Sequence, residues 1–251
     1  MTPVRTASLT PQWFTVVMGT SIVATAAHAL PVRSPALDAL AWAAWALAGS
    51  ALAITSIVAA RRLAAAPRAL RDQLLHPDVA PLFGAPAMGL LAFGTATLLV
   101  TEPVLGGAAV AADAALWVIG TAIGLATAIA VPALAFTRHR VGPDGASAAW
   151  LMPVVPPMVS AAAGALLLPH VAGTLAQSLA LACYAMAGAA GIAALVITTQ
   201  VWSRLAHRGT GPARGVPSLW MVLGPLGQGT TAMGLLADHA GPALGVPTRI
   251  L

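Results

Sequence analysis

Small or polar residues recur at one register along the chain, in four segments that each open an apolar stretch. These residues are Thr20, Gly89, Ser160 and Gln228. Hydroxyl and amide groups are neutral hydrogen-bond donors, so a ring of them suits an anion that must bind weakly and leave again. The same register also fits ordinary helix packing, in which a hydroxyl bonds back to its own helix and glycine permits close approach. Both interpretations stay open from the sequence.

The shared register comes from an internal repeat of roughly 70 residues, the length of one helical hairpin with its loops. Three residues before the ring positions lie Val17, Pro86, Pro157 and Pro225. A proline in a helix interior removes a backbone hydrogen bond and clashes with the preceding turn. We therefore expect Pro86, Pro157 and Pro225 to kink three helices at one level, with the freed carbonyls facing a neighbour or a cavity.

The elements that position these residues are predicted to be membrane-spanning helices. The 251 residues are 59% hydrophobic and 8% charged, with a mean hydropathy of +0.86, which leaves too little polar surface for a water-soluble domain. A spanning helix needs about 20 mainly apolar residues. The sequence contains seven such stretches, at approximately 12–30, 36–60, 84–102, 109–136, 153–170, 172–202 and 217–237. The predicted fold class is therefore all-α and polytopic.

A single transmembrane domain is expected over residues 1–251, as hairpins 12–60, 84–136 and 153–202 and a half-repeat 217–237. The odd-numbered stretches carry Gly, Pro, Ser, Thr and Gln, and are expected to form an inner ring around a central pore. The even-numbered stretches are rich in Ala, Leu, Ile and Trp, and are expected to face lipid. After the ring residues, Ser21 and Thr230 are the next candidates to line the pore.

The basic residues predict membrane topology rather than nucleic-acid binding. The net charge is +5, the chain has no lysine, and every arginine except Arg33 and Arg249 falls on one side of a seven-span layout. By the positive-inside rule, the N-terminus is expected in the cytoplasm and the protein in the plasma or inner membrane.

Signatures of catalysis and of metal binding are missing from the sequence. It contains no HExxH, GxSxG or GxxxxGK motif, and no metal-ligand spacing connects its histidines. The single Cys183 has no disulfide partner, and the inner stretches carry ionisable residues, such as Glu102 and Asp238, only near their outer ends. We expect no catalytic residue, no bound metal and no cofactor, so the protein is not expected to be an enzyme.

The first and seventh stretches carry specific motifs. They are Trp13-Phe14, Met18-Gly19-Thr20 before Ile22-Val23, and Gly224-Pro225-Leu226-Gly227-Gln228 before Thr230-Thr231-Ala232. Together they resemble the tellurite-resistance/dicarboxylate transporter family, which includes malate and sulfite transporters and is related to plant slow-anion channels. The resemblance implies ten helices as five hairpins around a pore, passage of anions and often a homotrimer. About seven of the ten helices are expected here, and the gating Phe of the ninth helix cannot be assigned.

The resulting hypothesis is transport of a small anion, either a C4-dicarboxylate such as malate, or sulfite or another inorganic anion. The pore is expected to be lined by Thr20, Ser160 and Gln228, with Ser21 and Thr230 next to them. Many members of the family have Gly where this chain has Ser21. The alternative is a truncated, non-transporting membrane protein or an assembly partner, and the sequence leaves open whether transport is passive or proton-coupled.

Overall fold

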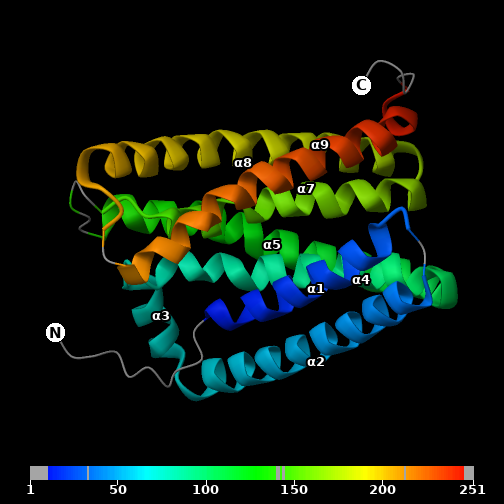
Figure 1. Cartoon of the computed structure of the whole chain (residues 1–251), viewed down its shortest axis with the longest axis horizontal. Helices are drawn as coiled ribbons and strands as arrows, with labels where there is room; N and C mark the ends of the chain where they lie inside the picture. Colours follow the sequence, from blue (N-terminus) through cyan, green and yellow to red (C-terminus); the bar gives the residue numbers. More distant parts are fainter. Residues whose placement is uncertain (1–10, 33, 140–141, 143–144, 212, 246–251) are drawn as a thin grey trace.

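The computed structural model describes residues 11–32, 34–139, 142, 145–211 and 213–245. Within these ranges every regular element is helical, which confirms the all-α prediction (Figure 1). The longer helices are α1 (Phe14–Ala29), α2 (Pro35–Ala65), α4 (Gly84–Leu105), α5 (Gly107–Thr137), α7 (Pro156–Leu167), α8 (Gly173–Arg208) and α9 (Leu223–Leu244). Two short helices are α3 (Pro67–Leu75), which the sequence analysis did not expect, and α6 (Leu151–Val154).

Four of the described helical segments are long and apolar enough to cross a membrane. They are Pro35–Ala65, Ala80–Leu105, Gly107–Thr137 and Gly173–Arg208. A fifth is formed by Ala148–Val154 and Pro156–His170 if this bent pair counts as one span. Helix α1 has only 16 residues, short of the usual spanning length, and α9 carries several polar residues. Spans at α1 and α9 therefore remain predictions.

The predicted inner helices begin with a backbone conformation that the outer helices lack. Each inner stretch opens with a 3₁₀ segment before its α-helix, whereas α2, α5 and α8 begin directly as α-helices of 31, 31 and 36 residues. The 3₁₀ segments are η1 (Pro11–Trp13), η2 (Ala80–Phe83), η3 (Ala148–Trp150) and η5 (Ala213–Val222). The repeat seen in the sequence is thus also a repeat of backbone conformation.

Two of the three expected proline kinks, those at Pro86 and Pro225, are not formed, because these prolines lie where their helices begin. Pro86 and Pro225 are the third residues of α4 and α9. Proline fits the first turn of a helix without losing a hydrogen bond, because the N–H groups there have no partner inside the helix. Pro157 is the second residue of α7, just after the helical path breaks at Val155, and here the two segments are bent by 45°.

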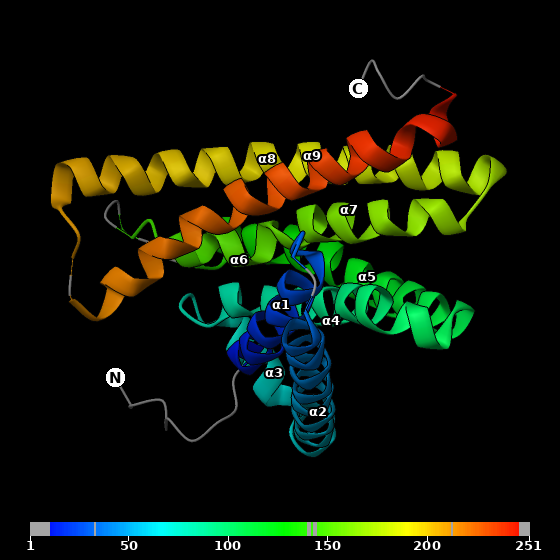
Figure 2. The same cartoon turned by 45° about the vertical axis from the view of Figure 1, so that its right-hand side comes forward.

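The inner helices pack in the order α1, α4, α7, α9, and the outer helices cover them (Figures 1 and 2). Helix α2 packs on α1, α5 packs on α4 and α7, and α8 packs on α7 and α9. Among the described residues, α1 and α9 make at most marginal contact with each other, so they form the two ends of an open row.

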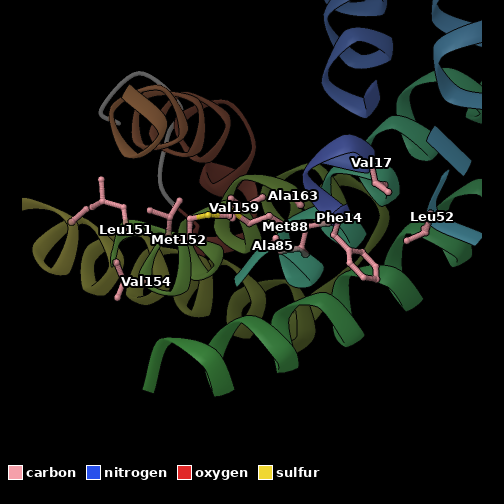
Figure 3. Packing of buried hydrophobic residues seen from close by; sticks show 13 residues of the cluster. Phe14, Val17, Leu52, Ala85, Met88, Leu151, Met152, Val154, Val159 and Ala163 are labelled. Atoms are coloured by element: carbon pink, nitrogen blue, oxygen red, sulfur yellow. The ribbon is translucent and has the colours of Figure 1, made fainter. Parts of the chain in front are cut away.

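The segment from α6 into α7 lies at the centre of this packing, and every residue from 151 to 165 is buried. Side chains from α1, α2, α4, α6 and α7 meet around it (Figure 3). Labelled members of this cluster are Phe14, Val17, Leu52, Ala85, Met88, Leu151, Met152, Val154, Val159 and Ala163.

The described arginine side chains all belong to one end of the bundle, where α2, α5 and α8 end and α4 and α9 begin (Figure 1, left). They are Arg61, Arg62, Arg68, Arg71, Arg138, Arg204 and Arg208. The described arginines thus fall on one side of the bundle, whereas the orientation of that side in the membrane stays a prediction. Arg5, Arg33, Arg140, Arg249 and the side chain of Arg214 lie outside the described part of the chain.

Close backbone approach holds α4 against α6. A Cβ atom added at Gly84 would lie 1.9 Å from the carbonyl oxygen of Met152. Because this obstacle is backbone, a side chain at position 84 must push the two helices apart.

We expect Gly84→Ala to lower the free energy of unfolding by about 1–3 kcal/mol, the usual cost of overpacking. Gly188→Ala, on α8, is the matched control because nothing lies within 4 Å of its added Cβ. Thermal unfolding of both variants in detergent measures the difference. Equal melting temperatures would contradict the packing described here.

Candidate functional site

The two candidate residues on α1 have different surroundings although they are adjacent in sequence. Thr20 is half-exposed, and its hydroxyl donates to the carbonyl of Val16. Ser21 is fully buried on the same face as Val17 and Ala24. Its Oγ atom has no hydrogen-bond partner in the described structure. Of the two, only Thr20 is placed at an accessible surface.

The ring positions on α4 and α7 are packing positions in this structure. Gly89 is buried, and a Cβ added there would lie 3.1 Å from the carbonyl oxygen of Phe14. Ser160 is fully buried, and its hydroxyl donates to the carbonyl of Pro156 over 3.1 Å. The carbonyl of Ser160 accepts a hydrogen bond of 2.8 Å from the indole N–H of Trp117, which ties α5 to α7.

The candidates on α9 are the more accessible ones. Thr230 and Thr231 are exposed, and their hydroxyls donate to the carbonyls of Leu226 and Gly227, each over 2.9 Å. Gln228 is half-exposed. Accessible polar side chains of the inner row are therefore found on its two end helices, α1 and α9, whereas the ring positions on α4 and α7 are buried.

The structure adds a polar residue that the sequence analysis missed. Asp113 lies on α5, which was expected to face lipid, yet its side chain is 1% exposed. Neither of its carboxyl oxygens has a hydrogen-bond partner among the described residues. A Cβ added at Gly94 of α4 would lie 2.5 Å from Oδ1 of Asp113. A lone acidic residue within an apolar stretch is the signal that could have identified it.

Helix α4, which carries Gly94, also carries two buried threonine hydroxyls and Glu102, which contacts His170. Thr97 accepts a hydrogen bond of 3.0 Å from the indole of Trp45, and the hydroxyl of Thr101 donates to the carbonyl of Thr97 over 2.7 Å. Near the end of α4, Oε1 of Glu102 lies 3.8 Å from Nε2 of His170. Polar side chains thus lie along α4 between its outer end and Gly94, and the two threonine hydroxyls are hydrogen-bonded to carbonyls of their own helix.

Metal binding and a cavity beside the arginine-bearing end remain to be considered. Among the described residues, no group of three His, Cys, Asp or Glu side chains is placed to hold a metal ion. A mainly apolar cavity of about 470 Å³ opens at the arginine-bearing end between α1, α2, α3 and η2, and Arg62 and Gln73 are among its lining residues.

The repeated inner and outer helices, the basic end and the buried helix contacts define a polytopic α-helical membrane protein. Residues 8–249 match the voltage-dependent anion channel family, and the chain belongs to that family. This confirms the resemblance carried by the motifs of the first and seventh stretches. The family comprises channels and transporters, which supports the expectation of a protein that is not an enzyme.

Relatives come from fungi and from an archaeon. The sulfite efflux pump SSU1 of Trichophyton rubrum is 32% identical over 238 residues, which make up 93% of this chain and 64% of that protein. The pump of the same name from Arthroderma otae is 31% identical over the same shares of both chains. An uncharacterized transporter of Methanocaldococcus jannaschii is 25% identical over 222 residues, or 88% of this chain and 63% of that protein. The chain therefore spans less than two thirds of the length of these relatives.

The hydrogen bond from Trp117 to Ser160 gives a test of the contact between α5 and α7. We expect Trp117→Phe to lower stability by about 0.5–1.5 kcal/mol, as for other hydrogen bonds between membrane helices. Trp202→Phe is the control, because Trp202 is 73% exposed on α8. Thermal unfolding in detergent compares the two, and a larger loss for the control would rule out this hydrogen bond as a stabilising contact.

Proposed function

We propose that the protein transports small anions across the cell membrane along a path lined by its inner helices. The observation that carries this proposal is the kind of polar group on these helices. Their accessible polar side chains in mid-helix are neutral hydroxyls and an amide, whereas their described ionisable residues, His28, Glu102, Asp238 and His239, lie in the outer halves. Neutral donors bind an anion without trapping it, as conduction requires.

The arginine-bearing end supports the same proposal. Charges gathered at one end of the bundle raise the local concentration of anions by long-range attraction. If this end is cytoplasmic, as the positive-inside rule predicts, anions are concentrated at the inner mouth. We propose this orientation, with the N-terminus in the cytoplasm.

The candidate pore-lining residues enter the proposal in two groups. Thr20, Gln228 and Thr230 are accessible, so they can meet an anion in the conformation described. Ser21 and Ser160 are buried at helix contacts, so they would line the path only after rotation of α1 or α7. Such a rotation is a change between two packed states and not a continuous deformation.

Sulfite is the first substrate to test, because two fungal relatives are named sulfite efflux pumps. Malate represents the C4-dicarboxylates. The experiment measures uptake of sulfite, malate, nitrate and chloride into liposomes that contain the purified protein, with empty liposomes as the reference. Selective uptake of one or more anions supports the proposal. Uptake equal to that of empty liposomes overturns it and favours a non-transporting assembly partner.

Gln228 supplies the sharpest test of the lining. We expect Gln228→Leu to reduce anion flux about fivefold, the effect of losing one neutral hydrogen bond of about 1 kcal/mol. Gln200→Leu is the matched control, because Gln200 is an exposed glutamine on the outer helix α8. Flux in liposomes, normalised to the amount of inserted protein, measures the effect. If both variants retain full flux, Gln228 does not line the path.

We also propose that the protein forms a homo-oligomer, as the family resemblance implies for a trimer. The lipid-facing surfaces of α5 and α8 carry exposed apolar side chains, including Ile129 and Ile192, which are available for contact with lipid or with a second copy. The mass of the detergent-solubilised assembly, measured by light scattering, distinguishes a trimer from a monomer.

A further inference from the structure

The Asp113 carboxyl group is an unpartnered polar group between an inner and an outer helix. It lies six residues after the start of α5, about 9 Å along the helix axis at 1.5 Å per residue. The side chain is 1% exposed, and neither oxygen accepts a hydrogen bond from a described residue. A carboxyl group in such surroundings is functional by default, because an acidic residue inside a membrane protein is costly to keep.

Among the described residues, no cationic side chain belongs to an element that packs on α5. The elements that pack on α5 are α4, α6, α7 and η2, and none of them carries an Arg, Lys or His residue. Their one titratable group is Glu102 of α4, eight residues beyond Gly94 and paired with His170. Helix α8 contributes the titratable side chains of Cys183 and Tyr184 to the cluster beside Trp117. An ionised carboxylate here would be buried without a partner, so the neutral acid is the favoured form.

A proton fits this site better than a metal cation. Cations such as Na⁺ or Ca²⁺ need several oxygen ligands, and the described residues hold no cluster of three acidic, His or Cys side chains. The nearby Thr97 and Thr101 hydroxyls already donate to carbonyls of their own helix. A proton needs only the carboxyl group itself.

The carboxyl group is in direct contact with the inner helix α4. A methyl group at Gly94 would lie 2.5 Å from Oδ1, so the acid fills the space that this glycine leaves. Helix α4 also contacts α1 through Gly89 and Phe14. Loss of the proton would leave a charge that must be solvated, which favours a state in which α4 and α5 separate at this level.

Polar side chains lie on α4 between its outer end and Gly94. Gly94, Thr97 and Thr101 are spaced so that they lie on one face of the helix, and both threonine side chains are buried. Glu102 and His170, which are partly exposed, lie next to this face at the end of the helix. The described hydrogen bonds do not join these side chains to Asp113, so a proton reaches it from this end only when water enters between α4 and α5.

We propose that Asp113 binds and releases the proton that couples anion movement to a pH gradient, and that it does so by controlling the contact between α4 and α5. This inference rests on the proposed anion transport and makes the protein a proton-coupled carrier rather than a passive channel.

The test compares the wild type with Asp113→Asn, which keeps the shape of the side chain but cannot exchange a proton. Liposomes contain sulfite, or whichever of malate, nitrate or chloride is transported, at equal concentration on both sides. The membrane potential is clamped and a pH gradient is imposed. A carrier that moves one proton per anion accumulates the anion about tenfold per pH unit, whereas Asp113→Asn is expected to accumulate no more than empty liposomes.

The melting temperature in detergent provides the second readout. We expect Asp113→Asn to unfold close to the wild-type temperature, because the side chain keeps its shape and stays neutral in the buried site, whereas a variant that has lost its structure would show no cooperative unfolding. Asp72→Asn is the control, because Asp72 is an exposed acid on α3, and it is expected to accumulate the anion like the wild type. Asp113→Glu, which restores an exchangeable proton, is expected to recover accumulation. An Asp113→Asn variant that still accumulates the anion in response to the pH gradient overturns the inference. A wild type that transports anions without response to the pH gradient overturns it as well. A wild type without any anion flux overturns the proposed function instead.

Discussion

Close approach at glycines, which have no side chain to hold neighbouring helices apart, is the constraint on which this structure depends. Lipid tails are as apolar as the helix surfaces, so helices in a bilayer associate through packing and hydrogen bonds and not through a hydrophobic driving force. The contacts of Gly84 with Met152, of Gly124 with Pro156, and of Gly164 with Cys183 and Trp117 are of this kind. They bring α4, α5 and α8 onto the buried α6–α7 segment, and the remaining helices pack around that centre.

The same close packing determines which polar groups are free to bind an anion or a proton. Hydroxyls in the middle of the inner row are satisfied by carbonyls of their own helices, as at Ser160, and have little capacity left for an anion. Thr20 of α1 and Thr230 of α9, at its ends, are accessible. The Asp113 carboxyl group differs from both because it is buried and unsatisfied; the Ser21 hydroxyl shares this state but cannot ionise. A group of this kind stores free energy that a proton or a helix movement can release.

Much of the helical framework could be predicted from the sequence, because long apolar stretches leave few alternatives to membrane helices. The predicted stretch 109–136 corresponds to α5, and 36–60 to most of α2. The positions at which the inner α-helices begin could not be predicted from the proline pattern alone. A proline is compatible with a helix start as well as with a kink, and only the preceding 3₁₀ segments distinguish the two cases.

The candidate site was less accessible to sequence analysis. The shared register of Ser160 and Gln228 identifies equivalent positions in a repeat, but not which helix face is free, because that depends on neighbours far away in sequence. Asp113 was missed for a related reason. Its helix has the composition of a lipid-facing element, and only the contact with Gly94 shows that this one side chain points into the protein.

The 3₁₀ segment before α9 also affects the length of this element along its axis. It runs for 10 residues, whereas such runs rarely exceed three or four residues. A 3₁₀-helix rises about 2.0 Å per residue and an α-helix about 1.5 Å, so conversion of this run would shorten it by about 5 Å. That is close to one full α-helical turn. Compared with a continuous α-helix, the 3₁₀ run therefore places Gln228 about one helical turn farther from Ala213 along the axis.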